Sequence, residues 1–302
     1  MSILSDMFAY AIQKLVFEPP PKPGYLEHEA SYVKTKNGLR IAMKTLHPVH
    51  KQEGRAAQVD SLIDLGVDFA VLPTPPVVFN EKPRPLLLYS HGNAEDLGTS
   101  YDYLQWLATN LNCDVLVYDY VGYGHSSVAL MSEANMYEAI EAVYQHAAQR
   151  MTHVWKNSSL FLMGRSLGST ASTRLARLLS QQQEETGTRL YHGLILLSPL
   201  ASGFRVLFRV GDSASTLYSM LDRLFCPVVH DIQSVGQGVL IIHGLQDQTI
   251  DIRNAYEIQA HVPMRSVYPP LYVDAGHNDV DQLHGAQMLS HIGKFMIHCL
   301  DR

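Results

Sequence analysis

The sequence contains no run of basic residues and is slightly acidic as a whole. Lys and Arg together number 23 against 29 Asp and Glu, which leaves a formal net charge of −6 at pH 7. Proteins that bind nucleic acids cluster Lys and Arg against the phosphates. The sequence therefore gives no reason to expect a nucleic-acid partner.

Cysteine is scarce as well. The chain has three cysteines, Cys113, Cys226 and Cys299, and they lie far apart in the sequence. A disulfide framework or a zinc site needs closer, paired spacing, so neither is expected. Cys113 and Cys299 have apolar neighbours, which is typical of buried free thiols. This cysteine usage favours a reducing compartment, and we expect a cytoplasmic protein.

Long apolar runs and metal-binding motifs are also missing from the sequence. No stretch of 18 apolar residues occurs, so no transmembrane helix is predicted, and the first residues lack the basic start of a signal peptide. No H-E-x-x-H motif and no Cys/His cluster occurs, so no metal is expected. No dinucleotide fingerprint is complete, and no cofactor is predicted.

The first 23 residues differ in pattern from the rest of the chain. Apolar residues recur at helical spacing over residues 3–16, and prolines follow at 19–21. We therefore expect an amphipathic helix and a proline-rich linker over 1–23, ahead of a domain over 24–302. The apolar stripe either packs on that domain or makes a peripheral contact with a membrane, although Lys14 alone gives it little basic character.

Short apolar runs alternate with helical patterns from residue 86 onward. The runs cover residues 86–89, 115–118, 160–163, 194–197, 239–242 and 271–273. Such alternation predicts a mostly parallel central sheet with helices on both faces, the architecture of the α/β-hydrolase fold. Two further strands are expected between 25 and 46, with a turn at Asn37-Gly38, and another strand at 69–72.

The connection between the runs at 194–197 and 239–242 is longer than a simple crossover requires. Residues 204–230 are rich in Leu, Phe and Val. They form either a small cap over the carboxyl edge of the sheet or an ordinary crossover helix with a long loop.

A candidate nucleophile follows the apolar run at 160–163. Residues 164–168 read Gly-Arg-Ser-Leu-Gly, which matches G-x-S-x-G between a predicted strand and a predicted helix. That strand–turn–helix context is where a serine hydroxyl is held clear of the backbone, with small residues on either side. We therefore predict that Ser166 is the catalytic nucleophile.

A serine needs a base to accept its proton and an acid to orient that base. In α/β-hydrolases these partners follow the serine in the order acid, then histidine. His277 lies in a glycine-containing loop after the last predicted strand, and Asp247 follows the strand before it. We predict His277 as base and Asp247 as acid; Asp251 and Asp274 are the alternatives for the acid.

The oxyanion that forms during acyl transfer needs two N–H donors. The backbone N–H of Leu167, at the start of the helix after the nucleophile, is the first predicted donor. The second should come from the loop after residues 86–89, where Asn93 is the candidate and Gly92 is expected to allow an unusual backbone. His91, in the same loop, is predicted to be a packed structural residue.

Four sequence segments together carry a resemblance to a known family. They are residues 89–98 (YSHGNAEDLG), 118–124 (YDYVGYG), 198–203 (SPLASG) and 275–279 (AGHND). In them the chain resembles the alpha/beta hydrolase domain-containing protein 17 family, serine hydrolases that remove palmitate from cysteines of membrane-associated proteins. The resemblance places nucleophile, acid and base on Ser166, Asp247 and His277.

The chain departs from that family at two places. No cysteine precedes Cys113, so the lipidated amino-terminal cysteine cluster of the family is absent from this sequence. Arg165 precedes the nucleophile where the family usually has Gln, so contacts around the turn are expected to differ.

The combined expectation is a serine hydrolase that cleaves acyl thioesters, most of all palmitate on S-acylated cysteines of proteins. S-acylated proteins are then its partners, at the cytosolic face of membranes. One alternative is a carboxylesterase or monoacylglycerol lipase that uses the same residues on oxygen esters. An alternative of another class is a catalytically silent binding protein on a hydrolase scaffold.

Overall fold

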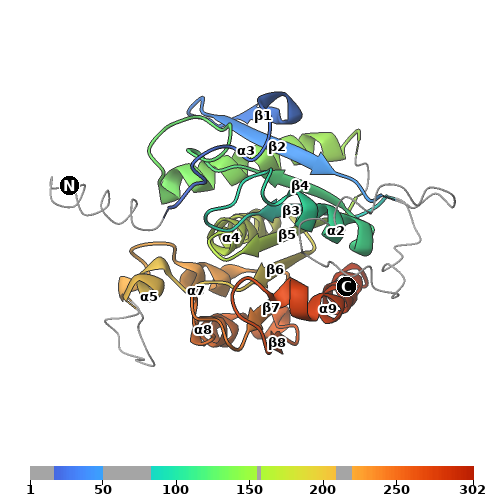
Figure 1. The fold of residues 1–302 in the computed structure, drawn as a ribbon. Helices are drawn as coiled ribbons and strands as arrows, with labels where there is room; N and C mark the ends of the chain where they lie inside the picture. The colour runs from blue at the N-terminus through green and yellow to red at the C-terminus, as the bar shows by residue number, and fades with distance from the viewer. Residues whose placement is uncertain (1–16, 50–82, 155–157, 209–219) are drawn as a thin grey trace, which may run out of the picture.

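An eight-stranded sheet forms the centre of the part of the protein that the structure describes (Figure 1). The computed structural model describes residues 17–49, 83–154, 158–208 and 220–302. The strands are β1 (Ser31–Lys34), β2 (Arg40–Leu46), β3 (Leu86–Ser90), β4 (Asp114–Tyr118), β5 (Leu160–Arg165), β6 (Gly193–Leu197), β7 (Gly238–Gly244) and β8 (Leu271–Val273). Their order is β1-β2-β4-β3-β5-β6-β7-β8. β2 is antiparallel to its neighbours β1 and β4. All the other neighbouring strands in this order pair in parallel.

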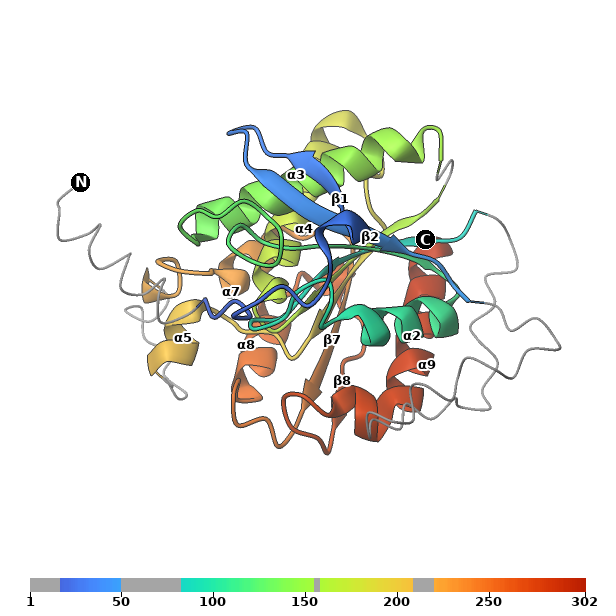
Figure 2. The same ribbon diagram turned by 45° about the horizontal axis from the view of Figure 1, so that its top comes forward.

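Helices cover both faces of this sheet (Figures 1 and 2). The α-helices are α2 (Tyr101–Leu111), α3 (Glu133–Met151), α4 (Gly168–Thr186), α5 (Gly203–Phe208), α7 (Val228–Asp231), α8 (Arg253–His261) and α9 (Val280–Leu300). Short 3-10 turns lie at Glu27–Glu29, Ile232–Ser234 and Met264–Ser266. α2 packs with α9 on one face, whereas α3, α4, α7 and α8 follow one another on the other face.

Buried strands send alternate side chains to opposite faces of the sheet. In β3, Leu86 and Leu88 join the core under α3 and α4, whereas Leu87 and Tyr89 join the core under α2 and α9. All four side chains are completely buried. A strand covered on both sides must be apolar throughout, which explains why the central strands read as continuous apolar runs.

The strand order places a functional site at one particular edge. From β3 the chain moves to β4 on one side, and it then returns to form β5 on the other side of β3. Loops leaving two such strands diverge at their carboxyl ends and open a crevice, where open α/β sheets bind ligands. The loop at residues 91–94 and the turn at Ser166 both leave the sheet at this point.

The fold confirms the predicted mostly parallel sheet with helices on both faces and the α/β-hydrolase architecture. The predicted hairpin is present, and Gly38 at its turn has a φ of 81°. The helix that follows Ser166, α4, ends at Thr186, because Gly187 follows it in the left-handed conformation that ends helices (φ 68°).

Some predicted segments lie wholly or partly outside the described residues. They are the helix over 3–16, the strand at 69–72 and part of 204–230. Within 204–230 the structure describes α5, which begins at Gly203, and α7. Among the described residues, no helix is long and apolar enough to cross a membrane. All three cysteines are buried free thiols, as predicted for Cys113 and Cys299.

Candidate active site

The turn after β5 holds Ser166 in a strained conformation. Its φ is 51°, in the left-handed region that side chains other than glycine rarely adopt. The backbone N–H of Ser166 donates to the carbonyl of Leu197 on β6 at 2.9 Å, and Ser169 N–H donates back to the Ser166 carbonyl at 3.0 Å. These bonds hold the turn so that the chain leaves β5 and enters α4 within two residues.

Both glycines of the motif are required by close backbone contacts. A Cβ on Gly164 would lie 2.4 Å from the carbonyl oxygen of Gly168, and a Cβ on Gly168 would lie 2.0 Å from that of Ser90. Neither contact can be relieved by a side-chain rotation, because each involves backbone atoms. The G-x-S-x-G spacing therefore lets α4 approach β3 and β5 closely enough to form the turn.

Ser166, His277 and Asp247 lie together in hydrogen-bonding sequence. His277 Nε2 is 3.0 Å from Ser166 Oγ, and His277 Nδ1 is 2.7 Å from Asp247 Oδ2. Ser166 follows β5, Asp247 follows β7 and His277 follows β8, so three separate loops meet at the carboxyl edge of the sheet. The structure brings together the three residues that the sequence predicts as nucleophile, base and acid.

The hydrogen-bond partners of His277 determine which ring nitrogen carries the proton in its neutral form. A carboxylate only accepts hydrogen bonds, so the proton of the ring lies on Nδ1, which faces Asp247. Nε2 is then unprotonated and accepts the hydroxyl proton of Ser166. This is the arrangement in which an imidazole acts as a general base toward a serine.

Several groups besides His277 hold the carboxylate of Asp247 in place. Its Oδ1 accepts the backbone N–H groups of Thr249 at 2.9 Å and Ile250 at 2.8 Å. Burial alone would raise the pKa of Asp247, but its bonds to His243 and His277 outweigh burial and lower the pKa well below the usual range. Asp247 is therefore a carboxylate throughout the neutral range.

His243 is a member of this group that the sequence reasoning missed. It lies near the end of β7, its side chain is completely buried, and its Nε2 is 3.2 Å from Asp247 Oδ2. The same nitrogen is 2.8 Å from the carbonyl oxygen of Ile250, so both neighbours are acceptors and the proton lies on Nε2. A histidine inside an otherwise apolar strand was the signal available in the sequence.

The alternative acids do not contact the imidazole of His277. The carboxylate of Asp251 binds the side chain and backbone N–H of Arg253. The backbone carbonyl of Asp274 accepts from His284 at 3.1 Å. Asp247 is the acid that the geometry selects.

The loop after β3 lies beside the nucleophile because of strand register. Ser90, the last residue of β3, pairs with Gly164 of β5, two residues before Ser166. Asn93, the predicted oxyanion donor, follows three residues later, and Leu167 immediately precedes α4. The roles of Asn93 and Leu167 as oxyanion donors remain predictions.

The expectation of an unusual backbone at Gly92 is wrong. Its φ is not in the left-handed region; Ala94, two residues later, has a φ of 58°. The Gly92 N–H instead donates to the Glu95 carboxylate at 3.1 Å, and a Cβ on Gly92 would lie 3.0 Å from that carboxylate. A side chain at this position would crowd the turn rather than strain the backbone.

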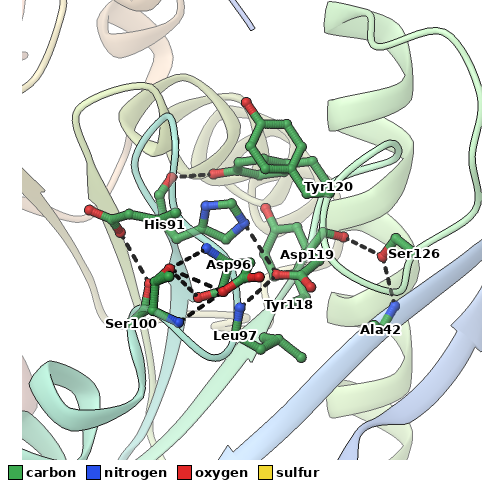
Figure 3. Close-up of polar contacts among 12 residues, drawn as sticks. Ala42, His91, Asp96, Leu97, Ser100, Tyr118, Asp119, Tyr120 and Ser126 are labelled. Carbon is green, nitrogen blue, oxygen red and sulfur yellow. Dashed lines mark hydrogen bonds and ion pairs between the residues drawn. The ribbon is translucent and has the colours of Figure 1, made fainter. Parts of the chain in front are cut away.

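His91 is a structural residue, as its sequence context predicts (Figure 3). Its ring is completely buried, Nδ1 bonds to the Gly92 carbonyl at 2.8 Å, and Nε2 faces Asp119 at 3.5 Å. Burial lowers the pKa of His91, which is therefore neutral, and burial raises the pKa of Asp119 to about 8. Tyr120 donates its hydroxyl proton to the His91 carbonyl at 2.6 Å, which fixes the backbone of the loop.

Residues 17–25, which we call the amino-terminal strap, cross this loop on the outside. The backbone N–H of Glu18 donates to Asn93 Oδ1 at 3.0 Å, and Gly24 N–H donates to Asp96 Oδ2 at 2.6 Å. Tyr25 donates its hydroxyl proton to Asp119 at 2.5 Å. The loop that carries the predicted oxyanion donor is thus bonded to both the core and the strap.

The site is built from protein groups without a recognisable metal cluster. Within the described part of the chain, no group of three or more His, Cys, Asp or Glu side chains is arranged to hold a metal ion.

The chain is similar to several known proteins. The family model described as "Serine aminopeptidase, S33" matches residues 81–225. Alpha/beta hydrolase domain-containing protein 17C of Xenopus laevis is 35% identical over 219 residues, which cover 71% of this chain and 62% of that protein. Alpha/beta hydrolase domain-containing protein aho-3 of Caenorhabditis elegans is 32% identical over 287 residues, which cover 92% of this chain and 75% of that protein.

Solved structures share the fold at low sequence identity. The esterase Est1E of Butyrivibrio proteoclasticus, solved with ferulic acid, matches with a TM-score of 0.61 at 15% identity and covers 90% of this chain and all (100%) of its own. The Pyrococcus furiosus esterase Pf2001 matches with a TM-score of 0.59 at 12% identity and covers 94% of this chain and 99% of its own.

The fold and the grouped Ser166, His277 and Asp247 define the class of protein as an α/β-hydrolase. Within that class, the chain belongs to the alpha/beta hydrolase domain-containing protein 17 family. The chain spans 62% of the length of its Xenopus relative.

Proposed function

We propose that this protein is a serine hydrolase that cleaves acyl thioesters and removes palmitate from S-acylated cysteines of proteins. The observation that carries the proposal is the hydrogen-bonded sequence of Ser166 Oγ, His277 and Asp247, at 3.0 and 2.7 Å. Membership of the family supports the choice of substrate.

The reaction follows from the tautomer of His277. Its Nε2 takes the hydroxyl proton as Ser166 Oγ attacks the thioester carbonyl, and the N–H groups of Leu167 and Asn93 stabilise the resulting oxyanion. The intermediate collapses with cleavage of the C–S bond, and the proton passes from His277 to the departing cysteine sulfur. Water then attacks the acyl-enzyme with His277 as base, which releases the fatty acid and restores Ser166.

Two measurements test this proposal. A fluorophosphonate probe should label the protein at Ser166, and a palmitoyl-cysteine peptide should be cleaved. Both activities should be lost in Ser166→Ala and kept in Ser234→Ala, which changes an exposed serine ahead of β7. A wild-type protein that the probe leaves unlabelled would contradict the proposal and favour a silent binding protein on this scaffold.

Hydrolysis of oxygen esters is the second candidate, since the similar solved structures include esterases. The two activities differ only in the leaving group. Rates on thioester and oxyester substrates with the same acyl chain separate them: a higher kcat/KM on the thioester supports the proposal. Preference for a p-nitrophenyl ester or a monoacylglycerol would identify a carboxylesterase or lipase instead.

We also propose that the protein acts at the cytosolic face of membranes and contacts them peripherally through residues 3–16. The apolar stripe in that segment supports the proposal. Deletion of residues 2–16 leaves Phe17, which is buried against Phe225, in place. Flotation with liposomes should be lost on this deletion, and equal flotation of both proteins would contradict the proposal.

A further inference from the structure

Arg165, the residue before the nucleophile, is largely but not fully buried, and it is charged. It ends β5, and only 12% of its side chain is exposed. Burial alone would lower the pKa of Arg165, yet the negative charge of Glu95 and further groups raises it, so the guanidinium stays ionised. A buried cation costs free energy unless it is paired and hydrogen-bonded, so its partners are informative.

The first partner belongs to the loop of the predicted oxyanion donor. Arg165 Nη1 is 3.5 Å from Glu95 Oε1. The other oxygen of Glu95 accepts the backbone N–H of Gly92 at 3.1 Å and the hydroxyl of Ser100 at 3.2 Å. Gly92 immediately precedes Asn93, so Glu95 connects the guanidinium to the backbone that presents this donor.

The second partner belongs to the loop of the base. Arg165 Nη2 donates to Asn278 Oδ1 at 3.2 Å. Asn278 directly follows His277, and the turn before it is closed by the Gly276 N–H, which donates to Asp279 Oδ1 at 2.6 Å. A bond to Asn278 therefore restricts how the backbone of His277 can move.

The shape of the guanidinium permits both contacts at once. Arginine presents five N–H donors in a rigid plane, whereas a lysine ammonium is a compact charge on a flexible stem. The plane of Arg165 also lies 5.6 Å from the ring centre of Tyr103 on α2, which favours one orientation of the side chain. Arg165 is also covalently joined to Ser166, so it connects both loops to the predicted nucleophile.

We propose that Arg165 is a positioning residue that holds the loop of Asn93 and the loop of His277 in register with Ser166. This inference rests on the proposed function for its catalytic consequence, but the geometry it describes does not depend on the substrate. Displacing catalytic groups by about 1 Å typically costs about 100-fold in rate, so small movements of either loop matter.

The kinetic test replaces Arg165 and compares kcat with KM on a p-nitrophenyl acyl ester and on a palmitoyl-cysteine peptide. In Arg165→Met, which keeps the length of the side chain but removes the guanidinium, kcat should fall by about 10- to 100-fold while KM changes little, because the loops position transition-state groups rather than the acyl chain. Arg165→Lys should recover part of kcat, since a lysine can pair with Glu95 but cannot also reach Asn278.

Arg177→Met is the matched control. Arg177 is a half-buried arginine of α4 that bonds to Asp231 at 2.7 Å, and neither residue contacts the catalytic group. This variant should lose some stability and keep its kcat. If both variants lose kcat in proportion to their loss of thermal stability, Arg165 is merely structural and the proposal is wrong.

A double-mutant cycle tests the connection through Glu95. If Arg165 acts on the donor loop through this carboxylate, Arg165→Met should cost less in kcat when Glu95→Gln is already present. Losses that multiply independently would remove the donor-loop half of the proposal.

Hydrogen exchange supplies a readout that does not need turnover. Amide exchange of residues 91–98 and of residues 274–279 should become faster in Arg165→Met and remain unchanged in Arg177→Met. Unchanged exchange in both segments would overturn the positioning role. Faster exchange in a protein that cleaves no ester would instead overturn the proposed function and leave the positioning role standing.

Discussion

At the scale of single residues, the acid of the site is defined by what surrounds its carboxylate. Asp247 accepts bonds from two histidine rings and two backbone N–H groups. An amide in its place could still accept at one atom, but its NH₂ group would face donors. The histidine would then lose the partner that keeps its proton on Nδ1.

Asp247→Asn is therefore expected to lower kcat by about 10⁴-fold with little change in KM, since the base would take the wrong tautomer. Steady-state hydrolysis of an acyl ester measures the effect. Asp251→Asn is the control, because Asp251 is half exposed and bonds to Arg253. Equal losses in the two variants would show that Asp247 is not the acid.

Sequence reasoning predicted which three residues the structure groups in hydrogen-bonding sequence, but not their surroundings. Ser166, Asp247 and His277 were predictable because each follows an apolar strand in the chain order of α/β-hydrolases. The contact of His243 with Asp247 was not predictable, since it depends on how the chain after β7 folds back and brings Ile250 beside His243. The backbone of Gly92 was predicted wrongly because glycine also occurs where a side chain would collide with a neighbour, here Glu95.

At the scale of elements, the turn between β5 and α4 depends on a glycine that touches backbone. Gly168→Ala would place a Cβ 2.0 Å from the carbonyl oxygen of Ser90, so α4 or β3 must shift. The expected loss is about 1–3 kcal/mol of unfolding free energy or more, with a large fall in activity. Urea unfolding and ester hydrolysis measure the two effects.

Gly236→Ala serves as the control for this substitution. The nearest atom to a Cβ there is Ser180 Oγ at 3.5 Å, an ordinary contact, and Gly236 lies far along the chain from the turn. Its stability and activity should stay close to those of the wild type. A Gly168→Ala protein as stable and active as this control would contradict the close packing of the turn.

Elements in the sheet could be predicted because burial on both faces makes a strand apolar throughout. The ends were less certain: β7 continues to Gly244, two residues past its apolar run, because its ladder with β8 includes His243 and Gly244. Strand order could not be predicted, since β3 lies between β4 and β5 only through pairing across distant parts of the chain.

At the scale of the whole molecule, the stability of the fold should depend on pH through a histidine away from the site. His192 precedes β6, its ring packs 5.8 Å from that of Phe161, and its Nδ1 is buried without a partner among the described residues. Burial, with a contribution from Arg189, lowers the pKa of His192 to about 4. The folded protein thus keeps this ring neutral at a pH where the unfolded chain protonates it.

The pKa of His192 is lower in the folded protein than the value near 6.5 in the unfolded chain. The free energy of unfolding is therefore at its full value, as far as His192 is concerned, above pH 6.5, and it decreases as the pH falls from 6.5 toward 4. The loss should reach about 1–2 kcal/mol after allowance for partial solvent exposure. Urea unfolding at several pH values should show a shallower decline for His192→Phe than for the wild type. His153→Phe, at an exposed histidine, should decline as the wild type does; equal slopes for both variants would contradict the role of His192.

The amino-terminal strap has a mechanical consequence. Four of the residues 19–23 are proline, so the chain between Phe17 and Gly24 is stiff and transmits displacement instead of absorbing it. One end of this short rod is bonded to the side chain of Asn93 and the other to Asp96. A force on the residues ahead of Phe17, whether from a fused tag or an anchoring surface, is therefore expected to displace the loop that carries the predicted oxyanion donor.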